Sequence, residues 1–190
     1  MNTSSPAPRA LRIVLIGYRG SGKTSVARPL AEKLGAPWFD ADQELQRTAG
    51  KTIAQIFADD GEPAFRHLEE AAITRLLQHD PPLVLALGGG AVMRESTRQR
   101  LREAALVVWL KASAGRLYER ITADAATQAN RPPLTAHGGL AEIEQLLAQR
   151  EPIYQAVSHF AVDAEDRTPS EIADAIFARL PAAAGESRQP

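Results

Sequence analysis

The chain has 190 residues, a formal net charge of −1, 44% hydrophobic and 24% charged residues, and no cysteine. Its length suits one domain with a substantial core, and a charge near zero supplies no general attraction to nucleic acid or to an anionic membrane. The lack of cysteine excludes disulfides, thiolate metal sites and cysteine nucleophiles. No apolar run approaches the length of a membrane span, so we expect no membrane partner. We also expect a cytoplasmic monomer that has no nucleic-acid partner.

The first structured elements surround a phosphate-binding motif. Residues 1–10 lack the apolar core of a secretory signal, and we expect them to form a disordered arm. The branched, apolar run at 11–16 predicts a buried strand, and apolar residues recur at helical spacing over 23–34. Between them, residues 17–24 read GYRGSGKT and match G-x-x-x-x-G-K-[ST], the P-loop. A strand before it and a helix after it are the context that this motif requires.

The P-loop predicts which atoms hold a nucleoside triphosphate. Its glycines turn backbone N–H groups toward phosphate oxygens, and the following helix adds the positive end of its dipole. Lys23 would place a charge on the β- and γ-phosphates, and the hydroxyl of Thr24 would bind Mg²⁺. The loop therefore indicates the donor of a phosphoryl group and leaves the acceptor open.

Two carboxylates follow the second strand, which the pattern places at 38–39, before helices near 41–49 and 52–58. Alternate residues of an extended segment point the same way, so Asp40 and Asp42 could both face the P-loop. One could hold a water of the Mg²⁺ shell, while the other orients a hydroxyl and receives its proton. The alternative is that either residue caps the next helix, although one helix start needs only one cap.

A helix over 61–79 precedes a third strand at 83–87 and the run Gly88-Gly89-Gly90. Bare glycine backbone can offer N–H groups to a carboxylate or hydroxyl of a ligand, but it also suits a tight turn. Arg66 on this helix, and Arg150 on a later one, could simply pair with neighbouring glutamates. If both arginines instead converge on one pocket, they favour an acidic small molecule, because guanidinium binds carboxylate through two N–H groups.

The second half of the chain continues the alternation of strands and helices. It predicts a helix near 94–102, a strand at 106–110, helices near 113–122 and 140–156, a strand around 159–162, and a last helix, capped by Thr168 or Ser170, that runs through Leu180. The polar segment 123–139, which contains proline and glycine, is predicted to be a mobile lid. Its Arg131 could close over the phosphates or remain a solvated loop arginine.

Strands separated by helices predict an α/β fold of three layers, a five-stranded parallel sheet flanked by helices. Ligands of such sheets bind beyond the carboxyl ends of the strands. The P-loop, the aspartate pair and the glycine run all follow strands in this way. We expect a single domain over 11–181, with a lid at about 123–139 and a disordered tail at 182–190.

Taken together, these motifs resemble those of the shikimate kinases, within the nucleoside-monophosphate-kinase-like group of P-loop proteins. The resemblance runs from about Ile13 to Leu180 through GYRGSGKT, FDAD, KTIAQIFADDGEPAFRHLEE, ALGGGAV, NRPPL and AQREPIY, in that order. It implies ATP-dependent phosphorylation of the 3-hydroxyl of shikimate, a step of chorismate and aromatic amino-acid biosynthesis. The co-substrate would be ATP, and the metal would be Mg²⁺.

The resemblance also implies roles for individual residues. The catalytic residues would be Asp42 as the proposed base, Lys23 and the lid residue Arg131. ATP would be bound by Gly20, Ser21, Gly22, Lys23, Thr24, Ser25, Arg120 near the adenine, and Arg131. Mg²⁺ would be held by Thr24 and, often through water, by Asp40. Shikimate would be bound by Asp42, Arg66, Gly88, Gly89, Gly90, Arg150, Phe57 and Phe65, with Glu69 supporting Arg66.

Two other functions remain open from the sequence. A gluconate-type kinase also acts on a small polyhydroxy acid, so the arginines alone do not separate it from a shikimate kinase. A non-catalytic nucleotide-binding module would need neither the aspartates nor a lid arginine. The lid departs from the family pattern, because Arg131 is followed by Pro-Pro-Leu where the family usually has Pro-Leu-Leu. Pro133 would stiffen the backbone at that point.

Overall fold

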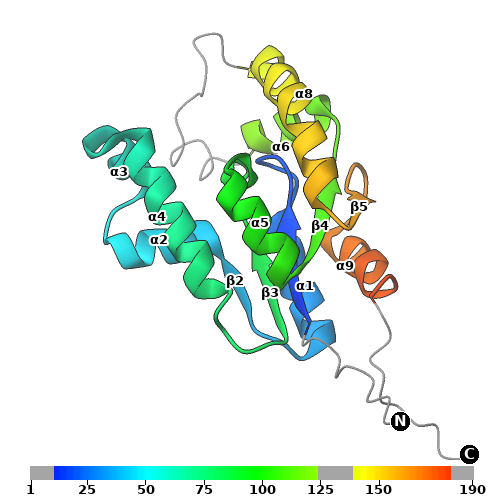
Figure 1. The fold of residues 1–190 in the computed structure, drawn as a ribbon. Helices are drawn as coiled ribbons and strands as arrows, with labels where there is room; N and C mark the ends of the chain where they lie inside the picture. Colours follow the sequence, from blue (N-terminus) through cyan, green and yellow to red (C-terminus); the bar gives the residue numbers. More distant parts are fainter. Residues whose placement is uncertain (1–10, 124–138, 181–190) are drawn as a thin grey trace, which may run out of the picture.

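The computed structural model describes residues 11–123 and 139–180, and strands and helices alternate along them (Figure 1). The strands are β1 (Arg12–Ile16), β2 (Trp38–Asp40), β3 (Leu83–Ala86), β4 (Leu106–Lys111) and β5 (Phe160–Asp163). The helices are α1 (Lys23–Leu34), α2 (Ala41–Ala49), α3 (Ile53–Asp59), α4 (Gly61–Leu76), the 3-10 turn η1 (Ala91–Met93), α5 (Glu95–Ala104), α6 (Ala114–Ala123), α8 (Gly139–Val157) and α9 (Pro169–Phe177).

The strands of the described residues form one parallel sheet in the order β2-β3-β1-β4-β5. The central strand β1 pairs on one side with β3, where Val14 stands opposite Leu85, and on the other with β4, where Val14 stands opposite Val107. Because all strands run in one direction, their carboxyl ends meet at a single edge of the sheet. The loops that follow β1, β2 and β3 therefore come together there.

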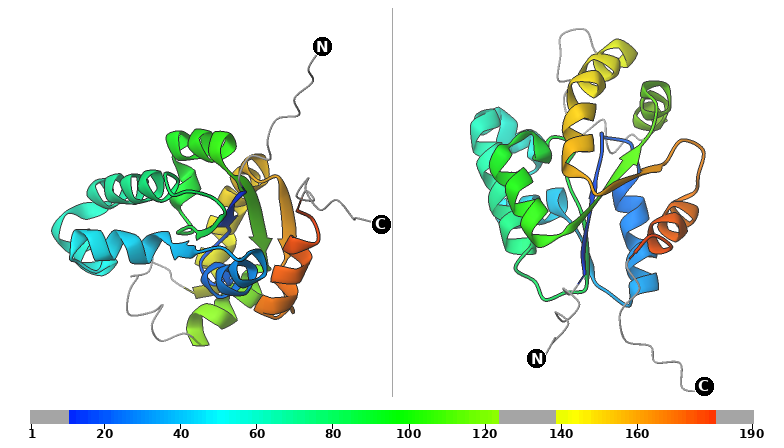
Figure 2. Two further views of the ribbon diagram at one scale, coloured as in Figure 1. Left: turned by 90° about the horizontal axis from the view of Figure 1, so that it is seen from below. Right: turned by 45° about the vertical axis from the view of Figure 1, so that its right-hand side comes forward.

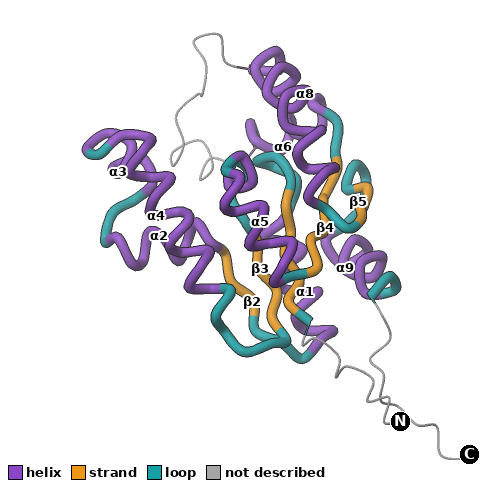
Figure 3. The backbone as a smooth tube through the Cα atoms, in the orientation of Figure 1, coloured by secondary structure: helices purple, strands orange, loops and turns teal. Residues whose placement is uncertain are grey.

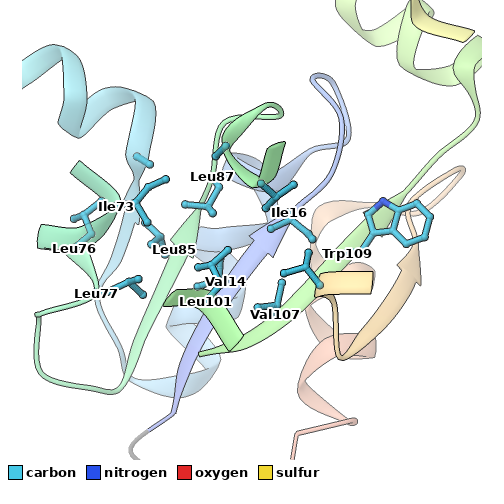
Figure 4. Packing of buried hydrophobic residues seen from close by; sticks show 14 of the residues in the cluster. Val14, Ile16, Ile73, Leu76, Leu77, Leu85, Leu87, Leu101, Val107 and Trp109 are labelled. Carbon is cyan, nitrogen blue, oxygen red and sulfur yellow. The ribbon is translucent and has the colours of Figure 1, made fainter. Parts of the chain in front are cut away.

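Alternation of side chains along β1 divides the core into two clusters. Val14 and Ile16 pack with residues of α4, α5 and α8 on one face (Figure 4), whereas Ile13 and Leu15 pack with α1 and α9 on the other. Helices accordingly cover both faces of the sheet, as the two views of Figure 2 show. This double coverage explains why the strands are continuous apolar runs without polar alternation.

Helices α2, α3 and α4 form a helical arm beside β2 (Figures 1 and 3). Its own core contains Leu45 of α2, Ile56 of α3 and Phe65 of α4. The side chain of Thr52 accepts a hydrogen bond from the backbone of Gln55, whose side chain accepts one from Thr52 in return, so α3 begins with a capping box. The helical arm places one side of α4 against the loop that follows β3.

The predicted fold class and order of elements are confirmed, with shifts at some ends. Helix α4 ends at Leu76 rather than near 79, since the N–H groups of Gln78 and His79 bond three residues back in tighter turns. Thr168, not Ser170, caps α9, which ends at Phe177. None of the described helices is long and apolar enough to cross a bilayer. The predictions for residues 1–10, for most of the 123–139 lid and for the 182–190 tail fall outside the described residues, and the single domain over 11–181 stays a prediction.

Candidate active site

The P-loop forms the turn between β1 and α1 at the carboxyl edge of the sheet. Gly17 and Gly20 have φ angles of 144° and 82°, a conformation that residues with a side chain rarely adopt. A Cβ at Gly17 would lie 2.6 Å from the carbonyl oxygen of Leu110, and one at Gly20 would lie 2.9 Å from Cγ1 of Ile121. The loop is therefore pressed against β4 and α6 on one side, and its other side lines a cavity.

Lys23, the first residue of α1, folds back into the P-loop. Its ammonium group donates to the carbonyl oxygens of Gly17 at 3.0 Å and Tyr18 at 2.8 Å, and to the hydroxyl of Ser21 at 3.3 Å. Only 8% of Lys23 is exposed. These contacts hold a positive charge at the N-terminus of α1, where backbone N–H groups also favour an anion.

Asp40 connects the P-loop helix to the helical arm. Its Oδ2 accepts a 2.6 Å hydrogen bond from the hydroxyl of Thr24, and its Oδ1 accepts from the backbone N–H of Asp42 and of Gln43, at 2.9 and 3.2 Å. Asp40 is thus the N-cap of α2, so the capping alternative holds for this residue, and it also faces Thr24. A hydroxyl and a carboxylate beside the phosphate loop are oxygen ligands suited to Mg²⁺, which keeps most of its ligands as waters and phosphates.

The described residues contain no group of three or more His, Cys, Asp or Glu side chains that could hold a metal ion by themselves. Thr24 and Asp40 together offer two oxygen ligands, a set that suits Mg²⁺ when phosphate oxygens bind the ion at the same time. The donor set therefore fits a metal that arrives with a nucleotide.

Asp42, two residues after the cap, stands against the glycine run. A Cβ built on Gly88 would lie 2.8 Å from Oδ1 of Asp42 and 2.9 Å from Oε1 of Glu69. Only glycine lets both carboxylates approach the backbone this closely. Asp42 also lines the cavity together with Lys23 and Thr24. A carboxylate in this place can orient a hydroxyl toward the P-loop and receive its proton.

Arg66 lies on α4 with glutamates on either side. Its NH1 donates to Oε2 of Glu69 at 2.8 Å, while Nε and NH2 donate to Oε1 of Glu62 at 3.2 and 3.1 Å. Burial lowers the pKa of Arg66, but the charges and hydrogen bonds of the two glutamates outweigh it and leave the pKa raised. The predicted pairing with neighbouring glutamates is therefore present. It also holds the guanidinium beside Gly90, whose Cβ position is 2.8 Å from NH1.

Two phenylalanines of the helical arm pack near Arg66. The rings of Phe57 on α3 and Phe65 on α4 have centroids 4.6 Å apart, and the guanidinium carbon of Arg66 lies 5.1 Å from the Phe65 ring centroid. Phe65 is buried, while Phe57 is partly buried. Phe65 therefore packs between the guanidinium of Arg66 and the ring of Phe57.

Helix α8 reaches the P-loop and the glycine run through two of its side chains. The guanidinium carbon of Arg150 lies 5.4 Å from the centroid of the Tyr18 ring in the P-loop. One turn further along α8, the hydroxyl of Tyr154 donates a 2.6 Å hydrogen bond to the carbonyl oxygen of Gly89. Arg66 therefore stands beside Gly90, while Arg150 stands beside Tyr18 and Tyr154, the second of which holds Gly89.

Arg120 on α6 is held by the loop that follows β5. Its NH2 donates to the carbonyl oxygens of Ala164 at 2.8 Å and Glu165 at 3.0 Å, in the loop after β5. Arg120 lines the cavity with Arg167 and Pro169 of the same loop. Arg131, the predicted lid residue, lies outside the described residues.

A cavity of about 550 Å³ runs along this edge of the sheet. The predicted residues that line it are Gly20, Ser21, Gly22, Lys23, Thr24, Ser25, Asp40, Asp42, Gly88, Gly89 and Arg120. The predicted residues that stand outside its lining are Phe57, Phe65, Arg66, Glu69, Gly90 and Arg150. Glu69 stands beside Gly88, which lines the cavity, and Arg66 stands beside Gly90, two residues further along the same run.

Several lining residues were missed by the sequence analysis, namely Arg19, Gln43, Gln46, Arg167, Pro169 and Ile172. For Arg167 and Pro169 a signal was present. They follow the carboxyl end of β5, and the rule that places ligands beyond strand ends applies to this loop as it does to the others. Gln43 and Gln46 lie on α2, where sequence spacing alone does not say which face meets the P-loop.

Comparison with known proteins gives a consistent family. The family model described as shikimate kinase matches residues 19–181. A shikimate kinase of Rhodopirellula baltica is 37% identical over 187 residues, covering 98% of this chain and 98% of that protein. One of Thermobifida fusca is 42% identical over 170 residues, covering 90% of this chain and 95% of that protein.

Solved structures agree with the sequence relatives. A shikimate kinase from Acinetobacter baumannii in complex with shikimate superposes with a TM-score of 0.82 at 33% identity, covering 88% of this chain and 91% of that chain. A gluconokinase from Sinorhizobium meliloti superposes with a TM-score of 0.57 at 24% identity, covering 90% and 91%. The second likeness concerns the fold alone.

Proposed function

The chain belongs to the shikimate kinase family, and we infer that it catalyses the ATP-dependent phosphorylation of the 3-hydroxyl of shikimate. One observation supports this most directly. The glycine run has Asp42 beside Gly88, the P-loop beside Gly89 and Arg66 beside Gly90. A hydroxyl-orienting carboxylate, a phosphate cradle and a carboxylate-binding arginine thus meet on three consecutive residues. This is the arrangement that a kinase for a hydroxylated acid needs.

At the donor side, the N–H groups of Gly20–Ser25 and the charge of Lys23 would bind the β- and γ-phosphates of ATP. Lys23 already lies inside the loop, so it needs only to exchange its carbonyl partners for phosphate oxygens. Thr24 and Asp40 would hold Mg²⁺, which when bound neutralises phosphate charge and orients the phosphates. Arg120 and the loop at Arg167 would face the adenine.

At the acceptor side, Asp42 would accept a hydrogen bond from the reacting hydroxyl and take its proton. The hydroxyl oxygen forms a bond to the γ-phosphorus as the bond from that phosphorus to the β,γ-bridging oxygen breaks. The products are shikimate 3-phosphate and ADP. Asp42 would thus both orient the hydroxyl and act as its base, while positioning and charge stabilisation by the other groups supply much of the remaining rate.

Arg66 of α4 and Arg150 of α8 would together bind the carboxylate of the acid. Glu69 and Glu62 keep Arg66 charged and fixed, and Phe57 and Phe65 would contact the ring of the substrate. Arg131 is proposed to close over the transferred phosphoryl group. Charge at that point counts most in the transition state, where negative charge is spread over the phosphoryl oxygens.

We propose that the protein is a monomer. We propose that this monomer acts in the cytoplasm, where ATP is supplied. Light scattering of the purified protein measures the molar mass, and a value near the 20.5 kDa of one chain is expected.

The function is tested by a coupled ADP assay with Mg²⁺ and ATP and with shikimate, gluconate or no acid added. We expect ADP release only with shikimate, and mass spectrometry should find one phosphate added to it. Equal turnover with gluconate would point to the gluconate-type kinase, which has a similar fold. No turnover with either acid would point to a non-catalytic nucleotide-binding module.

A further inference from the structure

The hydroxyl of Tyr154 makes a contact that the mechanism above does not use. Tyr154 is 0% exposed, and its ring packs in the core with Trp109 at a centroid distance of 5.9 Å. From this fixed position the hydroxyl donates a 2.6 Å hydrogen bond to the carbonyl oxygen of Gly89. A buried hydroxyl on a rigid ring constrains its acceptor more than an exposed side chain would.

Tyr154 stays protonated in this setting. Burial raises its pKa to about 12, and the nearby Arg150 guanidinium acts in the opposite direction through its charge and a hydrogen bond. The O–H group is therefore present as a donor across the neutral pH range.

Gly89 is the point where the two sides of the site touch. A Cβ on Gly89 would lie 3.0 Å from the backbone nitrogen of Arg19 and 3.4 Å from the carbonyl oxygen of Gly17. The residue before it stands against Asp42, and the residue after it stands against Arg66. A shift of Gly89 would therefore change the distance from the P-loop to both groups at once.

The two sides are held by separate contacts. The P-loop is held by Lys23, which bonds to Gly17, Tyr18 and Ser21. The glycine run is held by Tyr154, with further support from the bonds of Ala91 to Gly88 and of Met93 to Gly90 in the turn that follows. Loss of the tyrosine hydroxyl should therefore loosen the acceptor side and leave the phosphate cradle in place.

We propose that Tyr154 is a positioning residue, whose hydroxyl holds Gly88–Gly90 at the distance from the P-loop at which the acceptor acid meets ATP. The proposal rests on the proposed function for the identity of the acid. Arg150 lies one turn earlier on α8, so the same helix face would both bind the carboxylate and fix the backbone against which the acid lies.

The test is the variant Tyr154→Phe, which keeps the ring and removes only the hydroxyl. Two controls are matched to it. Tyr118→Phe makes the same change at a tyrosine that is 38% exposed, and Val157→Ala weakens the same core cluster on the same helix. The measurements are the KM for shikimate, the KM for ATP, kcat and the hydrogen exchange of peptides covering residues 17–24 and 87–93.

We expect Tyr154→Phe to raise the KM for shikimate about tenfold and to leave the KM for ATP within about twofold. Exchange should become faster over 87–93 and not over 17–24. Val157→Ala should lower the melting temperature and leave the KM for shikimate near that of the wild type. Unchanged kinetics in Tyr154→Phe, or an equal rise of its KM values for shikimate and for ATP, would overturn the proposal.

The test of Tyr154 can be distinguished from the test of the proposed function. If the wild-type protein does not phosphorylate shikimate, the proposed function fails. Hydrogen exchange still decides the role of Tyr154, because it needs no substrate. Faster exchange confined to 87–93 in Tyr154→Phe would support the positioning role, and unchanged exchange there would contradict it.

Discussion

The two sides of the site are built in different ways. The donor side, residues 17–24, is one continuous segment, and the contacts of Lys23 reach at most six residues back along the chain. The acceptor side takes Asp42 from α2, Arg66 from α4, the glycine run from the loop after β3, and Tyr154 from α8. Its hydrogen bond from Tyr154 to Gly89 spans 65 residues. A local motif carries its own geometry, whereas an assembled site depends on the sheet and the helical arm.

This difference predicts how substitutions divide between the two substrates. Changes at the donor side should alter the binding of ATP, and changes at the acceptor side should alter the KM for the acid. A change at Asp42, where the transferred phosphoryl group meets its acceptor, should instead alter turnover.

The largest effect is expected for Asp42→Asn. The amide keeps the shape of the side chain but cannot take the proton, so kcat should fall by about a thousandfold. The KM for ATP should change little. Steady-state ADP release measures this, with Asp80→Asn as the control at an exposed aspartate. Turnover near that of the wild type would rule out Asp42 as the base.

Lys23→Ala should have the next largest effect, with kcat lowered about a hundredfold, because it removes the charge that stabilises the phosphates. Binding of ATP should weaken as well, while binding of shikimate in the absence of nucleotide should persist. Calorimetric titration of each ligand separates the two. Lys33→Ala, on the same helix and paired with Asp174, is the control. Loss of shikimate binding in Lys23→Ala would show that the two sides are not independent.

Arg66→Ala should raise the KM for shikimate about tenfold and leave the KM for ATP unchanged, because the guanidinium is proposed to bind the acid and not the nucleotide. Arg75→Ala removes an arginine from the exposed side of the same helix and is the control. An equal rise in both KM values would count against the assignment. Arg66→Lys should recover little of the loss, since an ammonium group lacks the two parallel N–H donors.

The smallest effect is expected for Gly90→Ala. The added Cβ would lie 2.8 Å from NH1 of Arg66, and the end of that flexible side chain can move aside. The KM for shikimate should rise about threefold, with the melting temperature nearly unchanged. Gly115→Ala is the control, since its nearest contact would be 3.9 Å away. A large loss of stability in Gly90→Ala would mean that the backbone, and not Arg66, gives way.

The sequence predicted the donor side of the site more completely than the acceptor side. At the donor side it placed Lys23 and Thr24 at the start of the helix that follows the first strand and the P-loop glycines, as the structure has them. For the aspartate pair it left open which residue caps a helix, and the structure assigns the cap to Asp40. It could not decide whether Arg66 pairs with its neighbours or faces a pocket, and the structure shows the pairing with Glu62 and Glu69 and places the guanidinium beside Gly90. It gave no role to Tyr154, because a tyrosine on a helix does not reveal what its hydroxyl reaches.

By itself the sequence determined the alternation of strands and helices, the P-loop and the family, because apolar periodicity and short motifs act over neighbouring residues. Only the tertiary structure decided that Asp42, Arg66 and Tyr154 lie against one glycine run. The strand order β2-β3-β1-β4-β5 brings their elements to the same edge of the sheet. That order arises from packing two separate cores onto the sheet, which no local pattern specifies.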